Sequence, residues 1–177
     1  RGALRDRSAL VSTVMQDPRV GTMANLTVFE NMAFAEQRGK RRSLWPFGNN
    51  AQRERFVSRL RMLDMGLENF LDQPIGSLSG GQRQAISVVM SMLADSHVLL
   101  LDEITAALDP GSSEAIMAKT ATLVQQQRRT CLMITHDLDH ALQFGDRLIF
   151  LRNGVFVADF DAAAKTALSR ADLAAYF

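Results

Sequence analysis

Cysteine and long apolar runs are scarce in this 177-residue chain. Its single cysteine, Cys131, cannot form an internal disulfide. Because Cys131 opens the apolar run that ends at Ile134, a buried small side chain is favoured over a reactive thiol. No stretch approaches the ~18 consecutive apolar residues of a transmembrane helix, and the N-terminus shows no signal-peptide pattern. These absences exclude a disulfide scaffold, and we expect a reducing compartment and no membrane span.

An excess of charge of either sign is lacking as well. Twenty basic and nineteen acidic residues leave a net charge of +1, and the hydrophobic content of 47% is that of one globular domain. The basic segment from Arg38 to Asn50, with Trp45 and Phe47, permits a nucleic-acid surface. Its shortness and the neutral overall balance favour a solvated loop between two helices. We therefore predict no nucleic-acid partner.

A third absence concerns phosphate binding. The 177 residues contain no G-x-x-x-x-G-K-[ST] loop, and the first residue is Arg1 rather than Met. A phosphate-binding group in this chain must therefore use another pattern.

The stretch Leu78–Gln82 offers such a pattern. Ser79 followed three residues later by Gln82 is typical of a capping box, which predicts a helix from Gln82 to Ala94. Gly80 and Gly81 let backbone N–H groups approach a ligand, and the positive end of a helix dipole suits a phosphate. A glycine-rich turn before an ordinary helix is the alternative for these residues alone.

An apolar run ending in two acids follows. The residues from Val98 to Leu101 predict a strand buried on both faces, and Asp102 and Glu103 then lie at its carboxyl end. Open α/β sheets bind ligands at that edge. A solvated pair of carboxylates is the structural alternative.

Four motifs, Leu78–Gln82, Leu101–Glu103, Ala107–Asp109 and Thr135–Asp137, resemble in order and spacing the nucleotide-binding subunit of ATP-binding cassette (ABC) transporters. The resemblance implies an α/β fold, with a truncated P-loop NTPase (RecA-like) parallel-sheet core and an inserted α-helical subdomain. Residues 1–16 would end a core strand, residues 17–94 would form the helical subdomain, and residues 95–177 would complete the core. It also implies that the phosphate loop lies upstream of residue 1.

The same resemblance assigns roles to residues around ATP and Mg²⁺. Asp102 would hold Mg²⁺, mostly through water, since this ion prefers hard oxygen ligands and keeps its hydration shell. Glu103 would polarise the attacking water, Gln16 would touch the metal or that water, and His136 would contact the γ-phosphate. A glutamine before a turn and a packed histidine are the structural alternatives for Gln16 and His136.

The residues Ser79 to Gln82, called here the signature residues, would act on the ATP of a facing subunit. The resemblance implies that Ser79, Gly80, Gly81 and Gln82 cover that nucleotide and that Asp109 crosses to the facing subunit. Whatever its function, Asp109 before a proline predicts the N-cap of a helix that runs to about residue 127.

The implied partners are a second nucleotide-binding subunit in a homodimer or pseudo-dimer, transmembrane permease subunits and, indirectly, an extracytoplasmic substrate-binding protein. The implied location is peripheral, on the cytoplasmic face of the inner membrane. The runs Asp102–Pro110 and Phe144–Ile149 look like a bacterial importer branch, some members of which are associated with aromatic amino acids such as tryptophan. A non-transport cassette ATPase of DNA repair or translation and a non-hydrolytic interaction fragment remain the alternatives.

Local patterns predict the remaining elements. Ala9–Met15 and Thr130–Thr135 indicate strands, and Thr27 with Glu30 indicates a capped helix ending near residue 37. A second helix around Phe56 would end at Gly66. The Asn153-Gly154 pair predicts a hairpin within residues 147–159, and the tail from residue 161 is expected to be helical, with Ser169 or Asp172 as a cap.

Overall fold

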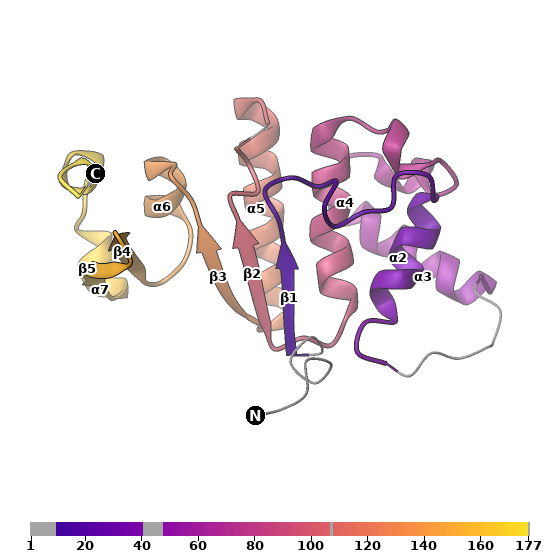
Figure 1. Ribbon diagram of the computed structural model, residues 1–177, viewed down its shortest axis with the longest axis horizontal. Helices are drawn as coiled ribbons and strands as arrows, with labels where there is room; N and C mark the ends of the chain where they lie inside the picture. Colours follow the sequence, from indigo (N-terminus) through magenta and orange to yellow (C-terminus); the bar gives the residue numbers. More distant parts are fainter. Residues whose placement is uncertain (1–9, 41–47, 107, 177) are drawn as a thin grey trace. The chain divides into compact units, whose positions relative to one another are not determined.

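The computed structural model describes residues 10–40, 48–106 and 108–176 (Figure 1). Most of the predicted basic loop, including Trp45 and Phe47, lies outside the described residues, as does Ala107. The chain divides into two compact units, residues 1–134 and 135–177.

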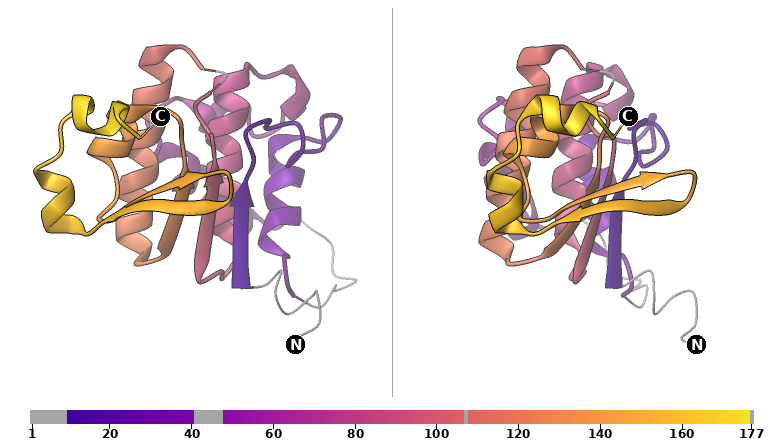
Figure 2. Two further views of the ribbon diagram at one scale, coloured as in Figure 1. Left: turned by 60° about the vertical axis from the view of Figure 1, so that its left-hand side comes forward. Right: turned by 90° about the vertical axis from the view of Figure 1, so that its left-hand side faces the viewer.

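A three-stranded parallel sheet forms the centre of the first unit. The strands β1 (Val11–Val14), β2 (Val98–Asp102) and β3 (Thr130–Ile134) lie in the order β1-β2-β3. The long helix α5 (Pro110–Gln127) runs along one face of these strands (Figures 1 and 2). The α/β architecture with a parallel sheet confirms the predicted fold class.

Burial along the strands differs from the prediction for a strand covered on both faces. Leu99 and Leu101 are buried, whereas Leu100 between them is only half-buried. On β3, at the edge of this sheet, Leu132 and Ile134 are 55% and 56% exposed. The prediction of two covered faces is therefore wrong for the described residues, because packing in this unit buries one face more completely than the other.

Cys131 lies in β3 and is partly buried. Burial raises the pKa of its thiol to about 11. Since the thiolate is the reactive form, this environment agrees with the prediction that Cys131 is not a reactive thiol.

Helices and short 3₁₀ turns make up the rest of the first unit. These are α2 (Val28–Glu36), α3 (Asn50–Arg61), η1 (Leu67–Phe70), η2 (Ile75–Ser77) and α4 (Gly80–Leu93). The predicted capping box of Thr27 and Glu30 opens α2. Their shared core consists of Val28, Met32, Phe56, Leu60, Leu63, Leu67 and Ile75.

Gly66 does not end α3. That helix ends at Arg61 with Met62 as its C-cap, and Gly66, at φ +66°, precedes η1 instead. A glycine at positive φ marks any sharp change of chain direction, so its identity alone did not show which element it bounds.

Arg129 caps the C-terminal end of α4 from the loop before β3. Its guanidinium donates hydrogen bonds to the carbonyl oxygens of Met92 (3.1 Å) and Ala94 (2.7 Å) and to Ser96 Oγ (2.8 Å). Partial burial lowers the pKa of this arginine. The contact ties the end of α4 to the start of β3.

Replacing this arginine by methionine is expected to destabilise the chain. Arg129→Met removes charge-assisted hydrogen bonds and leaves helix-end carbonyls without donors, which costs about 2–3 kcal/mol. Urea unfolding followed by circular dichroism measures the change in the free energy of unfolding. The matched control is Arg61→Met at an exposed position of α3. Equal stability of the two variants would contradict the capping role.

The second unit has its own small core. It contains α6 (Leu138–Gln143), the antiparallel strands β4 (Leu148–Arg152) and β5 (Val155–Phe160), α7 (Ala162–Thr166) and α8 (Arg170–Ala174). Asn153 and Gly154 both adopt positive φ, which confirms the predicted hairpin turn. Ser169 and Asp172 form a capping box at α8. Among the described residues, none of the helices combines the length and apolarity that crossing a bilayer requires.

Candidate active site

The ends of two neighbouring parallel strands bring Gln16 and Glu103 together. Val14 and Leu101 are paired in register. Gln16 lies two residues after Val14, and Glu103 lies two residues after Leu101. Gln16 Nε2 donates a hydrogen bond to Glu103 Oε2 at 3.2 Å. Residues 87 positions apart in the sequence thus meet at the carboxyl edge of the sheet, where α/β proteins bind ligands.

The backbone of Glu103 leaves the strand in an uncommon conformation. Its φ is +45°, in the left-handed region that non-glycine residues rarely occupy. The Glu103 N–H donates to the Ile134 carbonyl oxygen at 3.0 Å, and its own carbonyl accepts from the Ala106 N–H at 3.1 Å. Such strain persists where surrounding contacts fix the chain, and it concentrates at functional sites. No sequence pattern indicated this turn.

Asp102 is the last residue of β2 and lies opposite Ile134 in the β2–β3 register. It is half-buried at the strand end. Within residues 10–40, 48–106 and 108–176, no three His, Cys, Asp or Glu side chains gather in a way that would hold a metal ion. A single strand-end carboxylate suits Mg²⁺ that keeps most of its ligands as water and phosphate oxygens. The assignment of Asp102 to Mg²⁺ stays a prediction.

The signature residues open α4 as the sequence predicted. Ser79 is the N-cap: its N–H donates to Gln82 Oε1 at 3.0 Å, and its Oγ accepts from the Gln82 N–H at 3.3 Å. A Cβ added to Gly80 would meet no heavy atom within 4 Å, so the first turn is open to a ligand. A Cβ on Gly81 would lie 3.6 Å from Leu108. The exposed N–H groups therefore fit a phosphate, although the packing around residue 80 does not itself require glycine.

Asp109 caps α5 beside this turn. Its Oδ1 accepts the Ser112 N–H at 3.0 Å, and hydrogen bonding with Ser112 lowers the pKa of the Asp109 carboxyl. The N-cap prediction is confirmed. A role for Asp109 toward a facing subunit stays a prediction.

His136 belongs to the second unit. It lines a shallow pocket of about 340 Å³ with Asp137, Leu138, Asp139 and Arg170. Asp137 caps α6 by accepting the N–H groups of Asp139 (2.9 Å) and His140 (3.1 Å). The residues predicted for catalysis thus fall in both units, and the γ-phosphate role of His136 stays a prediction.

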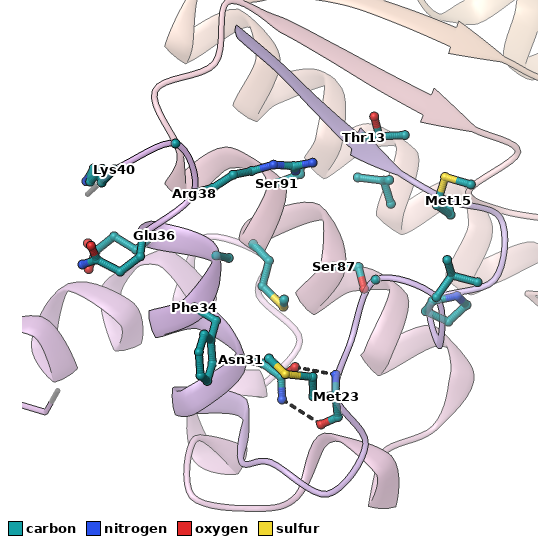
Figure 3. A pocket seen from close by; sticks show the side chains of 18 of the residues that line it. Thr13, Met15, Met23, Asn31, Phe34, Glu36, Arg38, Lys40, Ser87 and Ser91 are labelled. Carbon is teal, nitrogen blue, oxygen red and sulfur yellow. Dashed lines mark hydrogen bonds between the residues drawn. The ribbon is translucent and has the colours of Figure 1, made fainter. Parts of the chain in front are cut away.

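A larger cavity of about 1070 Å³ lies between β1, α2 and α4 (Figure 3). Its lining includes Thr13, Phe34 and Ser87 but none of the predicted site residues. Asn31 and Met23 also line it, and Asn31 accepts the Met23 N–H at 2.8 Å and donates to the Met23 carbonyl oxygen at 3.1 Å. Asn31 therefore fastens the loop after β1 to α2, a structural role that sequence reasoning missed and that no motif signalled.

Comparison with known proteins shows which family this chain resembles. A family model described as ABC transporter matches residues 2–106. The tyrosine transport ATP-binding protein of Clostridioides difficile (strain R20291) is 44% identical over 157 residues, which cover 86% of this chain and 61% of the relative. The glycine betaine/proline betaine transport system ATP-binding protein ProV of Escherichia coli (strain K12) is 32% identical over 135 residues, 76% of this chain and 32% of the relative.

The fold is shared with solved structures. The ATP-binding cassette MJ0796, in a dimeric post-hydrolysis state bound to ADP and Pi, superposes with a TM-score of 0.73 and 26% identity over 89% of this chain and 65% of that chain. The chain spans less than two thirds of the length of these relatives.

Proposed function

Because the chain belongs to the ABC transporter family, we propose that it is part of the ATP-hydrolysing subunit of a bacterial binding-protein-dependent importer. The observation that carries this proposal is the 3.2 Å contact between Gln16 and Glu103 at the edge of the parallel sheet. It joins two residues with proposed roles toward the attacking water. The capped helix start at Ser79 adds a phosphate-binding surface.

The proposed reaction is phosphoryl transfer from ATP to water, in which positioning and charge stabilisation supply most of the catalysis. Glu103 polarises the water and Gln16 orients it, while Asp102 would hold Mg²⁺, whose charge would stabilise the phosphates. His136 donates a hydrogen bond to the γ-phosphate. In a head-to-tail dimer, the signature residues of one subunit cover the ATP bound by the other.

Closure of this dimer on ATP and its reopening after hydrolysis would drive permease subunits in the membrane. The proposed location is therefore peripheral, on the cytoplasmic face of the inner membrane. An extracytoplasmic binding protein would deliver the solute. MJ0796 was solved as a dimer, which supports the proposed assembly.

For the solute we propose an amino acid with an aromatic side chain. The relative named for tyrosine transport is 44% identical, whereas a relative named for glycine betaine and proline betaine transport is 32% identical. In the proposed importer the solute contacts the permease and the binding protein rather than this chain. The choice of solute therefore rests on sequence identity to ATP-binding proteins named for their transported solute.

Inactivation of the gene is expected to abolish high-affinity uptake of radiolabelled tyrosine or tryptophan and to leave betaine uptake unchanged. Reintroducing the wild-type gene, but not a Glu103→Gln version, should restore uptake. Loss of betaine uptake instead would support the importer proposal but contradict the proposed aromatic amino acid as its solute. Normal uptake of all these solutes together with sensitivity to DNA damage would contradict the importer and favour a non-transport cassette ATPase.

A further inference from the structure

Two consecutive residues of α4, Arg83 and Gln84, follow directly after the signature residues. Both are turned inward: Gln84 is 2% exposed and Arg83 is 8% exposed. Gln84 Nε2 donates a hydrogen bond to the carbonyl oxygen of Met15 at 3.2 Å. Met15 precedes Gln16, so one side of Gln16 is fastened to the signature helix.

Arg83 precedes Gln84 in α4 and acts electrostatically on Asp17, the residue that follows Gln16. Its Nε and Nη2 atoms are buried without a hydrogen-bond partner. The positive charge of Arg83 contributes to the lowered pKa of the Asp17 carboxyl, for which hydrogen bonds from Arg19 are the larger cause. Asp17 accepts the Arg19 backbone N–H at 2.9 Å and Arg19 Nε at 3.0 and 3.1 Å, and the Arg19 side chain is 77% exposed. Asp17 is therefore held by the exposed cation Arg19, whereas Arg83 is a buried cation with spare donors.

Burying a guanidinium with unused donors lowers the free energy of unfolding, so its presence calls for an explanation other than stability. Replacing such a group with an apolar side chain of similar volume is often neutral or stabilising. Stability therefore does not explain Arg83. Its place beside the segment 15–17 does offer an explanation, because that segment carries Gln16.

We propose that Arg83 and Gln84 are positioning residues that clamp the segment 15–17 and thereby hold Gln16 in hydrogen-bond contact with Glu103. The inference rests on the proposed function, since it gives the contact its catalytic meaning. The clamp links two sites within one chain: the helix start at Ser79–Gly81, which meets the facing subunit's ATP, and the Gln16–Glu103 contact, which serves the chain's own ATP. A shift of α4 on binding phosphate moves Gln16 through the Met15 carbonyl.

The clamp is tested first without nucleotide, in the 177-residue chain. Gln84→Met keeps the length of the side chain and removes the donor to Met15. Hydrogen exchange of residues 12–19, followed by mass spectrometry, is expected to accelerate about tenfold, the effect of losing one buried hydrogen bond. Gln126→Met, at an exposed position of α5, is the matched control and should leave this segment unchanged. Unchanged exchange in Gln84→Met would overturn the clamp.

The second test uses turnover. We define the extended cassette as residues 1–177 preceded by the phosphate-loop segment of the C. difficile relative. In this protein Arg83→Met is expected to lower kcat about tenfold, as expected for misplacing a catalytic group, while KM for MgATP stays within about twofold. The melting temperature should be equal or higher, a combination that a structural role would not produce. An unchanged kcat would contradict the positioning role of Arg83.

The two tests separate the two proposals. If the parent extended cassette hydrolyses no ATP, the proposed function fails, and the exchange experiment still decides on the clamp. If Gln84→Met does not fold, Arg83→Met decides alone, since it removes no hydrogen bond among those that the structure shows for its side chain.

Discussion

Glu103→Gln is expected to lower ATP turnover by the extended cassette about 10²- to 10³-fold, as expected for loss of a general base. Glutamine has nearly the shape of glutamate but lacks the negative charge that polarises the attacking water. ATP binding should persist, because the phosphate loop of the extended cassette is untouched. Phosphate release measured at saturating MgATP gives kcat, and equilibrium binding of a fluorescent ATP analogue gives the affinity.

The same variant should accumulate as an ATP-bound dimer, which size-exclusion chromatography in MgATP detects. Glu54→Gln, at an exposed position of α3, is the matched control and should behave like the parent. Unimpaired turnover by Glu103→Gln would remove this residue from the proposed mechanism. Impaired turnover together with lost ATP binding would indicate a damaged strand end rather than a missing base.

The elements that the sequence predicted well are those whose ends carry local chemistry. Ser79 with Gln82 and Thr27 with Glu30 are reciprocal hydrogen-bonding pairs within one helical turn, so short-range spacing determines where each helix begins. Asn153-Gly154 is equally local, because both residues tolerate the positive φ of a hairpin turn.

Features that depend on distant packing were not predictable in the same way. Gly66 was assigned to the end of α3, although the structure places it before η1. The half-exposed Leu132 and Ile134 have the composition of a covered strand, and only the sheet order shows that β3 is an edge here. The latch from Asn31 to the Met23 backbone belongs to no motif.

The candidate site likewise combines residues that the sequence predicted with contacts that it did not. The sequence identified Gln16 and Glu103 by resemblance, and the rule for parallel sheets predicted ligand binding at the carboxyl edge where they meet. It did not predict their hydrogen bond or the left-handed backbone of Glu103, since both arise from the register of β1, β2 and β3. Motifs with recognisable chemistry allowed site residues to be predicted, whereas the contacts between those residues became visible only in the structure.

The phosphate loop is expected to have the second large effect on the rate of ATP hydrolysis. The 177-residue chain is expected to hydrolyse MgATP at least about 10³-fold more slowly than the extended cassette, because catalysis of phosphoryl transfer depends on a backbone cradle and a lysine at the β- and γ-phosphates. The signature turn at Ser79–Gly81 does not replace that cradle, since its proposed ligand is the ATP of a facing subunit. Steady-state phosphate release by both proteins at equal concentration measures the ratio.

The matched control is the extended cassette with its phosphate-loop lysine changed to alanine, which should fall to near the rate of the 177-residue chain while keeping its length. Mixing the 177-residue chain with an extended cassette whose own signature turn is mutated adds a further distinction, because a signature helix supplied in trans should restore part of the activity. Turnover by the 177-residue chain alone would contradict the need for the phosphate loop. In that case the open turn at Gly80, with no heavy atom within 4 Å of an added Cβ, would be the first alternative cradle to mutate.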